Sequence, residues 1–89
     1  MDQLVIDLKS RLHITHSSED DRLKNSLQMS EKAIARMVGF DDLSDLEFLE
    51  LVLERSRYAY YDEVEYFEDS FHSQIVGLQM RGVEDETTA

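Results

Sequence analysis

The chain has 89 residues, no cysteine and no proline, and its formal net charge at pH 7 is −11. The lack of cysteine excludes a disulfide and a thiolate metal site, and the negative charge disfavours direct binding to nucleic acid or anionic lipid. No apolar run approaches the roughly 18 residues of a membrane span, and the N-terminus has no signal-peptide pattern. So short a chain has a thin core. We therefore expect one soluble domain that relies on compact helical packing, on oligomerisation, or on both.

Apolar residues recur at helical spacing, which predicts an all-α protein, a small bundle of three to four helices. The first predicted helix covers residues 2–13. A polar run at residues 17–21 follows, in which Ser17 or Ser18 is a good N-cap. The second helix is predicted from about residue 19 to residue 38, and Gly39 stands where a left-handed C-cap residue belongs.

The third predicted helix is the longest. Ser44 and Glu47 have the spacing of a capping box, and a helix unbroken to Ser70 would be about 40 Å long. Glu63 falls within its apolar stripe, so Glu63 is either buried with a partner or marks a bend. Ser70 is also a possible cap for a short fourth helix over residues 71–80, and the periodicity leaves both versions open.

These helices define a predicted core and a predicted domain boundary. We expect one helical domain over residues 1–81 and an acidic disordered tail over residues 82–89. The predicted core residues share the apolar stripes of the second and third helices: Leu23, Leu27, Ile34, Leu49, Val52, Leu53, Tyr60, Val64, Phe67 and Phe71.

Residues that could carry chemistry are sparse. His13 and His16, with Asp20 nearby, have a spacing that could bring two imidazoles to one cation. However, the pair straddles a predicted helix end, so a solvated turn is the better interpretation. The acid pairs fit a solvated helix face, and neither a nucleophile motif nor a phosphate-binding glycine loop is present. We predict no metal, no cofactor and no enzymatic activity.

The tyrosines of the third predicted helix indicate contact with other proteins. Leu51 and Tyr58 fall nearly opposite the apolar stripe, and Tyr61 lies on its flank, among glutamates. Apolar and aromatic side chains set in a charged face favour an interface, although isolated exposed ones are common. Arg55 and Arg57 are the only bases of the segment and could pair within their own helix or with a neighbour. The predicted subunit interface is Leu51, Arg55, Arg57, Tyr58 and Tyr61.

The run from Arg55 to Phe71 resembles the small head–tail connector proteins of tailed bacteriophages. There, an Arg-x-Arg-Tyr-x-Tyr segment precedes Glu-x-Phe-x-x-x-Phe, as in residues 55–60 and 65–71 here. The order of elements also fits over residues 2–78, with Leu12-His-Ile14 ending the first helix. Tyr61 departs from the pattern, because a small polar residue is expected there.

The resemblance implies a structural role in the virion. Members of this family form a ring, usually of twelve subunits, that docks beneath the portal protein after DNA packaging. The implied location is the head–tail junction of the virion, after assembly in the host cytoplasm. The ring extends the DNA channel and receives the head-closure or tail proteins, and DNA passes through it without specific binding. The alternative function is an acidic regulator or inhibitor that mimics DNA in a basic protein cleft. A small metal-dependent enzyme that uses the histidines is a third hypothesis.

Overall fold

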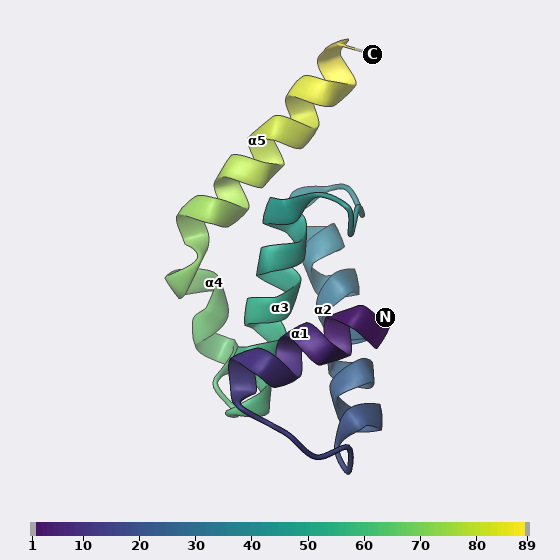
Figure 1. The fold of residues 1–89 in the computed structure, drawn as a ribbon. Coiled ribbons are helices and arrows are strands. Elements are labelled where there is room, and N and C mark those ends of the chain that lie inside the picture. Colours follow the sequence, from purple (N-terminus) through teal and green to yellow (C-terminus); the bar gives the residue numbers. More distant parts are fainter. Residues whose placement is uncertain (1, 89) are drawn as a thin grey trace.

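The computed structural model describes residues 2–88, and the side chains of residues 2–82. Within this range the chain is all-helical and forms no strand, as predicted (Figure 1). No described helix is both long and apolar enough to cross a membrane. The helices are α1 (Asp2–Leu12), α2 (Asp20–Val38), α3 (Leu46–Tyr60), the 3-10 turn η1 (Val64–Tyr66), α4 (Phe67–Ser70) and α5 (His72–Thr88).

Helices α2 and α3 form the centre of the fold. They run side by side in opposite directions, and α1 crosses both near one end (Figure 1). The chain then turns back through η1 and α4, and α5 returns along α3 toward the opposite end of the molecule. The molecule is elongated, with extents of 45 × 25 × 16 Å. The side chains that are less than 2 % exposed come from α1 to α5: Leu8, Leu23, Leu27, Ser30, Ile34, Phe48, Leu51, Val52, Ser56, Phe67 and Leu78.

Most of the predicted core residues lie in this interior. Six of the ten are buried: Leu23, Leu27, Ile34, Val52, Leu53 and Phe67. The other four, Leu49, Tyr60, Val64 and Phe71, are half-buried. Tyr60 lies at the edge because its hydroxyl donates a 2.9 Å hydrogen bond to the carboxylate of Glu19. The core also includes Leu4, Leu8 and Leu12 of α1, which share one helix face at steps of four.

The end of α3 rules out the unbroken helix to Ser70, one of the two versions that the periodicity leaves open, and the prediction that the third helix is the longest is wrong. Helix α3 has 15 residues and ends at Tyr60, and the longest helix is α2, with 19. Asp62 takes the left-handed conformation, with φ 58°. The amide of Glu63 donates to the Tyr58 carbonyl (2.8 Å), and the amide of Asp62 donates to the Ala59 carbonyl (3.1 Å). This is the Schellman pattern of helix termination, so the chain turns here and Glu63 is exposed, not buried.

The other helix ends use the same chemistry. Gly39, predicted as the left-handed residue after α2, has φ 88°, and its amide donates to the Ala35 carbonyl. His13 closes α1 with φ 60°, and the amide of Ile14 donates to the Lys9 carbonyl (2.9 Å). A non-glycine residue pays a steric cost at positive φ. At His13 and Asp62 that cost is offset by two backbone hydrogen bonds.

The start of α3 differs from the sequence prediction by one residue. The N-cap is Asp45, whose carboxylate accepts hydrogen bonds from the amides of Glu47 and Phe48, both 3.0 Å. Ser44, the predicted cap, instead donates its hydroxyl to Asp42 (2.6 Å). Before α2, Ser17 and Ser18 do not cap the helix either, because Glu19 holds the cap position without a side-chain bond.

Replacing Asp45 with alanine should lower the free energy of unfolding by about 1–2 kcal/mol. The change removes the cap of α3 and also the ion pair between Asp45 and Arg81 of α5. Urea denaturation monitored by circular dichroism measures the loss. Ser44→Ala is the matched control and should lower the free energy of unfolding clearly less. Equal losses for the two variants would contradict the assignment of Asp45 as the cap.

The C-terminal boundary predicted at residue 82 does not coincide with a helix end. Helix α5 continues through Gly82 to Thr88, and Ala89 lies outside the described residues. Gly82 packs closely on the α2–α3 loop, because a Cβ atom there would lie 3.1 Å from Cδ1 of Phe40. The division into a domain at residues 1–81 and a disordered tail at residues 82–89 stays a prediction.

Candidate assembly surfaces

The predicted interface residues of α3 divide into buried and exposed side chains. Leu51 was expected to face away from the core, and this is wrong, because Leu51 is 1 % exposed. Tyr58 is half-buried, with its ring edge-on to Phe67 and Phe71 at centroid distances of 5.8 Å. Both side chains are covered because α4 and α5 fold back over the side of α3 that a single straight helix would leave in solvent.

The two arginines of α3 have different surroundings. Arg57 donates to Glu54 (3.0 and 3.1 Å), and its guanidinium lies 5.4 Å from the centre of the Tyr58 ring. Arg55 makes no ion pair with any described side chain, and donates a 3.3 Å hydrogen bond to the buried hydroxyl of Ser30 on α2. Burial lowers the pKa of the Arg55 guanidinium, but an arginine stays charged at all ordinary pH values.

Glu54 is the centre of an ion-pair network that joins α1 to α3. Arg11 donates to both Glu54 (2.8 Å) and Glu50 (2.6 Å), and Arg57 donates to Glu54 from the other side. Burial of Glu54 favours its neutral form, but the hydrogen bonds from Arg57 and Arg11 outweigh burial and lower its pKa below the ordinary value. Only 12 % of the Glu54 side chain is exposed, so the network contributes to stability more than a surface pair does.

Tyr61 is exposed as predicted, at 52 %, and packs edge-on to Tyr60. Five other large apolar side chains among the described residues, which the sequence reasoning missed, are more exposed: Leu46 (80 %), Met29 (66 %), Met80 (62 %), Ile6 (60 %) and Tyr66 (58 %). Leu46 could not be found from the helical stripe, because it stands in the first turn of α3, before neighbouring helices reach it. The exposure of Tyr66 was not predicted, because Tyr66 lies in η1, after the turn that ends α3.

The histidines do not come together as ligands. His16 shares a 2.7 Å hydrogen bond with the hydroxyl of Ser18, and Asp20 forms an ion pair with Lys9 (2.9 Å). Among the residues that the structure describes, no three His, Asp or Glu side chains lie in an arrangement that could hold a metal ion.

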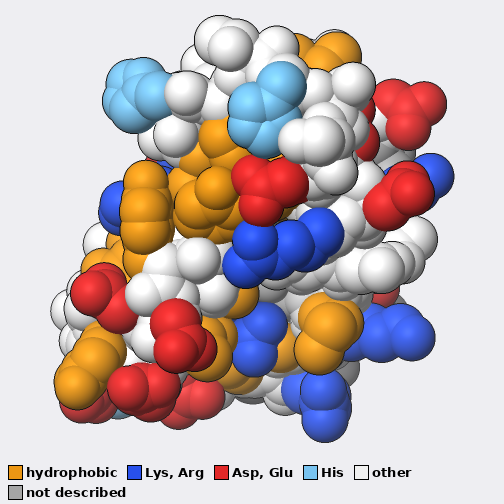
Figure 2. Space-filling view, turned by 90° about the horizontal axis from the view of Figure 1, so that it is seen from below, with side chains coloured by type: hydrophobic (Ala, Val, Ile, Leu, Met, Phe, Trp, Pro, Cys, Tyr) orange, Lys and Arg blue, Asp and Glu red, His pale blue; other side chains and the backbone are white. Residues whose placement is uncertain are grey.

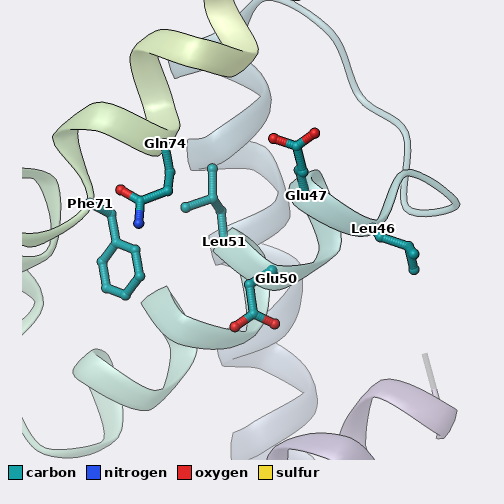
Figure 3. A pocket seen from close by; sticks show the side chains of 6 residues that line it. All are labelled: Leu46, Glu47, Glu50, Leu51, Phe71 and Gln74. Carbon is teal, nitrogen blue, oxygen red and sulfur yellow. The ribbon is translucent and has the colours of Figure 1, made fainter.

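A shallow apolar groove lies between α3 and the start of α5 (Figure 3). Its volume is about 400 Å³, and it is lined by Leu46, Glu47, Glu50, Leu51, Phe71 and Gln74. Leu51 and Phe71 form its floor, whereas Leu46 extends to one side. The two glutamates of the groove already pair within the protein, Glu47 with Arg81 and Glu50 with Arg11. The groove is open and shallow, and its charged side chains are already paired. It is therefore better suited to receive a side chain of another protein than to catalyse a reaction.

Charge is sorted by element on the surface. From Tyr58 to Met80 the chain has no lysine or arginine and carries Asp62, Glu63, Glu65, Glu68 and Asp69. Helix α2, in contrast, carries four bases and three acids. Seen from the end where residues 61–66 turn, acidic side chains gather at the lower left and basic ones at the lower right (Figure 2). Acidic and basic side chains therefore lie on different parts of the surface, and the surface is not uniformly acidic.

An all-helical body with exposed apolar side chains and with acidic and basic residues on different elements is typical of a protein that contacts other proteins. The sequence model of one family, described as phage gp6-like head-tail connector protein, matches residues 2–81. The match includes α1 to α4 and the part of α5 that packs on the body, so the chain belongs to this head–tail connector family. No curated protein and no solved structure matches the chain.

Proposed function

We propose that the protein is a structural subunit of a phage head–tail connector, which assembles as a ring between the portal protein and the head-closure or tail proteins. The ring extends the DNA channel, resides at the head–tail junction of the virion, and takes about twelve copies by the family resemblance. The observation that carries the proposal is the family match over residues 2–81, which spans the whole packed body.

The surface chemistry supports a channel role. Among the described side chains, eleven acids of residues 2–69 make no ion pair, whereas only four bases make none. Unpaired carboxylates near the channel axis would repel the phosphate backbone, so that DNA would slide without binding. The same repulsion makes DNA a poor ligand for the isolated subunit.

The DNA-mimic alternative is less well supported. Mimicry requires carboxylates at phosphate-like intervals along one continuous face. The most acidic segment, residues 62–69, is only eight residues long, and the exposed Tyr66 interrupts it. Exposed tyrosine among acids is more typical of a protein–protein contact.

Sedimentation velocity of the protein alone, and mixed with portal protein from the same phage, tests the proposal. We expect a ring-sized species that appears, or is strongly enriched, when the portal is present. Electron microscopy of portal-bearing heads mixed with the protein should then show added mass at the portal vertex. A monomer at all concentrations that never sediments with the portal would overturn the proposed function.

A further inference from the structure

The free bases of this acidic protein are concentrated on one helix. Among the described side chains, the lysines and arginines that make no ion pair are Lys24, Lys32, Arg36 and Arg55. Three of them belong to α2, whereas Arg55 is turned toward Ser30. Lys24, Lys32 and Arg36 are therefore free to make ionic contacts with a partner.

Two of these unpaired bases, Lys32 and Arg36, belong to a regular stripe along the outer side of α2, together with Arg22, which pairs with Glu19. The stripe consists of Arg22, Asn25, Met29, Lys32 and Arg36, at alternating steps of three and four, and we call it the basic stripe. At about 100° per residue its members lie within about 80° of one another. All five are exposed, and they lie on the side of the helix away from the buried Leu23, Leu27 and Ile34. This is the spacing of a helix that packs against a second partner.

A patch of opposite character lies on η1 and α4. Glu65, Tyr66 and Asp69 are all exposed and project away from Phe67, which anchors this segment in the core. We call them the acidic patch. Neither acid makes an ion pair with a described side chain. Figure 1 places α4 and α2 on different sides of α3, and the two elements make no contact.

The two surfaces match in spacing as well as in charge. Lys32 and Arg36 are four residues apart on α2, a rise of about 6 Å along the helix, and Glu65 and Asp69 are also four residues apart, across the junction of the 3-10 turn η1 with α4. Two ion pairs can therefore form together, and Met29, one turn from Lys32, can meet the Tyr66 ring in a sulfur–aromatic contact. One subunit cannot make these contacts with itself, because its own acidic patch lies beyond α3.

We propose that the basic stripe of one subunit binds the acidic patch of the next copy of the chain. The inference rests on the proposed ring, since a ring of more than two copies requires a head-to-tail contact between two different surfaces. The groove of Figure 3 is less suited to this contact, because its two glutamates are already neutralised by Arg11 and Arg81.

Charge reversal tests the pairing. One variant, Lys32→Glu with Arg36→Glu, makes both surfaces acidic; the other, Glu65→Lys with Asp69→Lys, makes both basic. Each should assemble at least about tenfold more weakly than the wild type, because like charges then face each other. An equimolar mixture should assemble again, because each reversed surface meets its complement in an alternating ring. Sedimentation velocity on the portal measures all three.

The controls separate this contact from folding and from the proposed function. Circular dichroism and urea denaturation check that both variants keep the wild-type fold. Lys24→Glu, which reverses an exposed base of α2 outside the basic stripe, should assemble like the wild type, and Lys32→Glu alone should not. Normal assembly of both double variants, or a mixture that fails to recover, would overturn this pairing and leave the connector function intact. If the wild-type protein never assembles on the portal, both the proposed pairing and the proposed connector function are wrong.

Discussion

Replacing Phe67 with alanine should lower the free energy of unfolding by about 3–5 kcal/mol. The Phe67 ring is 1 % exposed, stacks on Phe71 at 5.0 Å and meets the edge of Tyr58 at 5.8 Å. Phe67 is the only fully buried side chain of η1 and α4. Its packing therefore holds these two elements, and the α5 helix that follows them, against α3. A domain of this size has a total stability of roughly 5–15 kcal/mol, so the loss is a large fraction.

Urea denaturation gives the size of the effect, and amide hydrogen exchange gives its location. Protection should fall first in α5, because α5 is held to α3 partly through the Phe67 cluster. Tyr66→Ala is the matched control: the neighbouring ring is 58 % exposed, and its loss should change stability by no more than about 0.5 kcal/mol. Similar losses for Phe67→Ala and Tyr66→Ala would contradict this account of the returning segment.

The second large effect is expected at Glu54. Glu54→Gln should cost about 1.5–3 kcal/mol at neutral pH, because charge-assisted hydrogen bonds from Arg11 and Arg57 lose their anionic acceptor. Glu50→Gln removes a carboxylate that accepts only from Arg11 and is 54 % exposed, and it should cost less than about 1 kcal/mol.

The effect of Glu54 should depend on pH in a definite direction. Its folded-state pKa lies below the ordinary value of 4.5, so its contribution is present above that value and is lost as pH falls through the folded pKa. The difference in unfolding free energy between the wild type and Glu54→Gln should therefore shrink as pH is lowered from 7 to about 3. A difference that stays constant over this range would show that Glu54 acts through packing and not through its charge.

The helices themselves could be predicted from the sequence better than the residues at which they begin and end. The end of α2 was predictable because Gly39 is the usual residue for a left-handed cap. The end of α3 was not, because Asp62 holds the same conformation and aspartate carries a much weaker signal. That one turn explains two errors at once: the long helix, and the exposure assigned to Leu51, which the returning α5 covers. The cap of α3 was missed by one residue because Ser44 and Asp45 are both good caps, and only the structure shows that the Asp45 carboxylate, and not the Ser44 hydroxyl, faces the free amides.

The candidate surfaces were predictable only in part. Tyr61 could be placed on the surface from its position on the helical stripe. The basic stripe of α2 was open to the same reasoning, since its spacing of three and four is visible in the sequence. Pairing of Arg55 with Ser30, in contrast, depends on how α2 and α3 face each other and has no local signal.

The turn at Asp62 also determines toward which end of the molecule α5 extends. Because the chain reverses there, α5 leaves the body beside the loop of residues 39–45, at the opposite end from the loop of residues 13–19 (Figure 1). In any ring generated by rotation, every copy presents the same end to the same side. All the α5 ends, each of which includes Glu84, Asp85 and Glu86, would thus lie on the same side of the ring. A partner that meets this side would be held by many weak contacts at once, so its retention would depend on the number of copies more than on the affinity of any one of them.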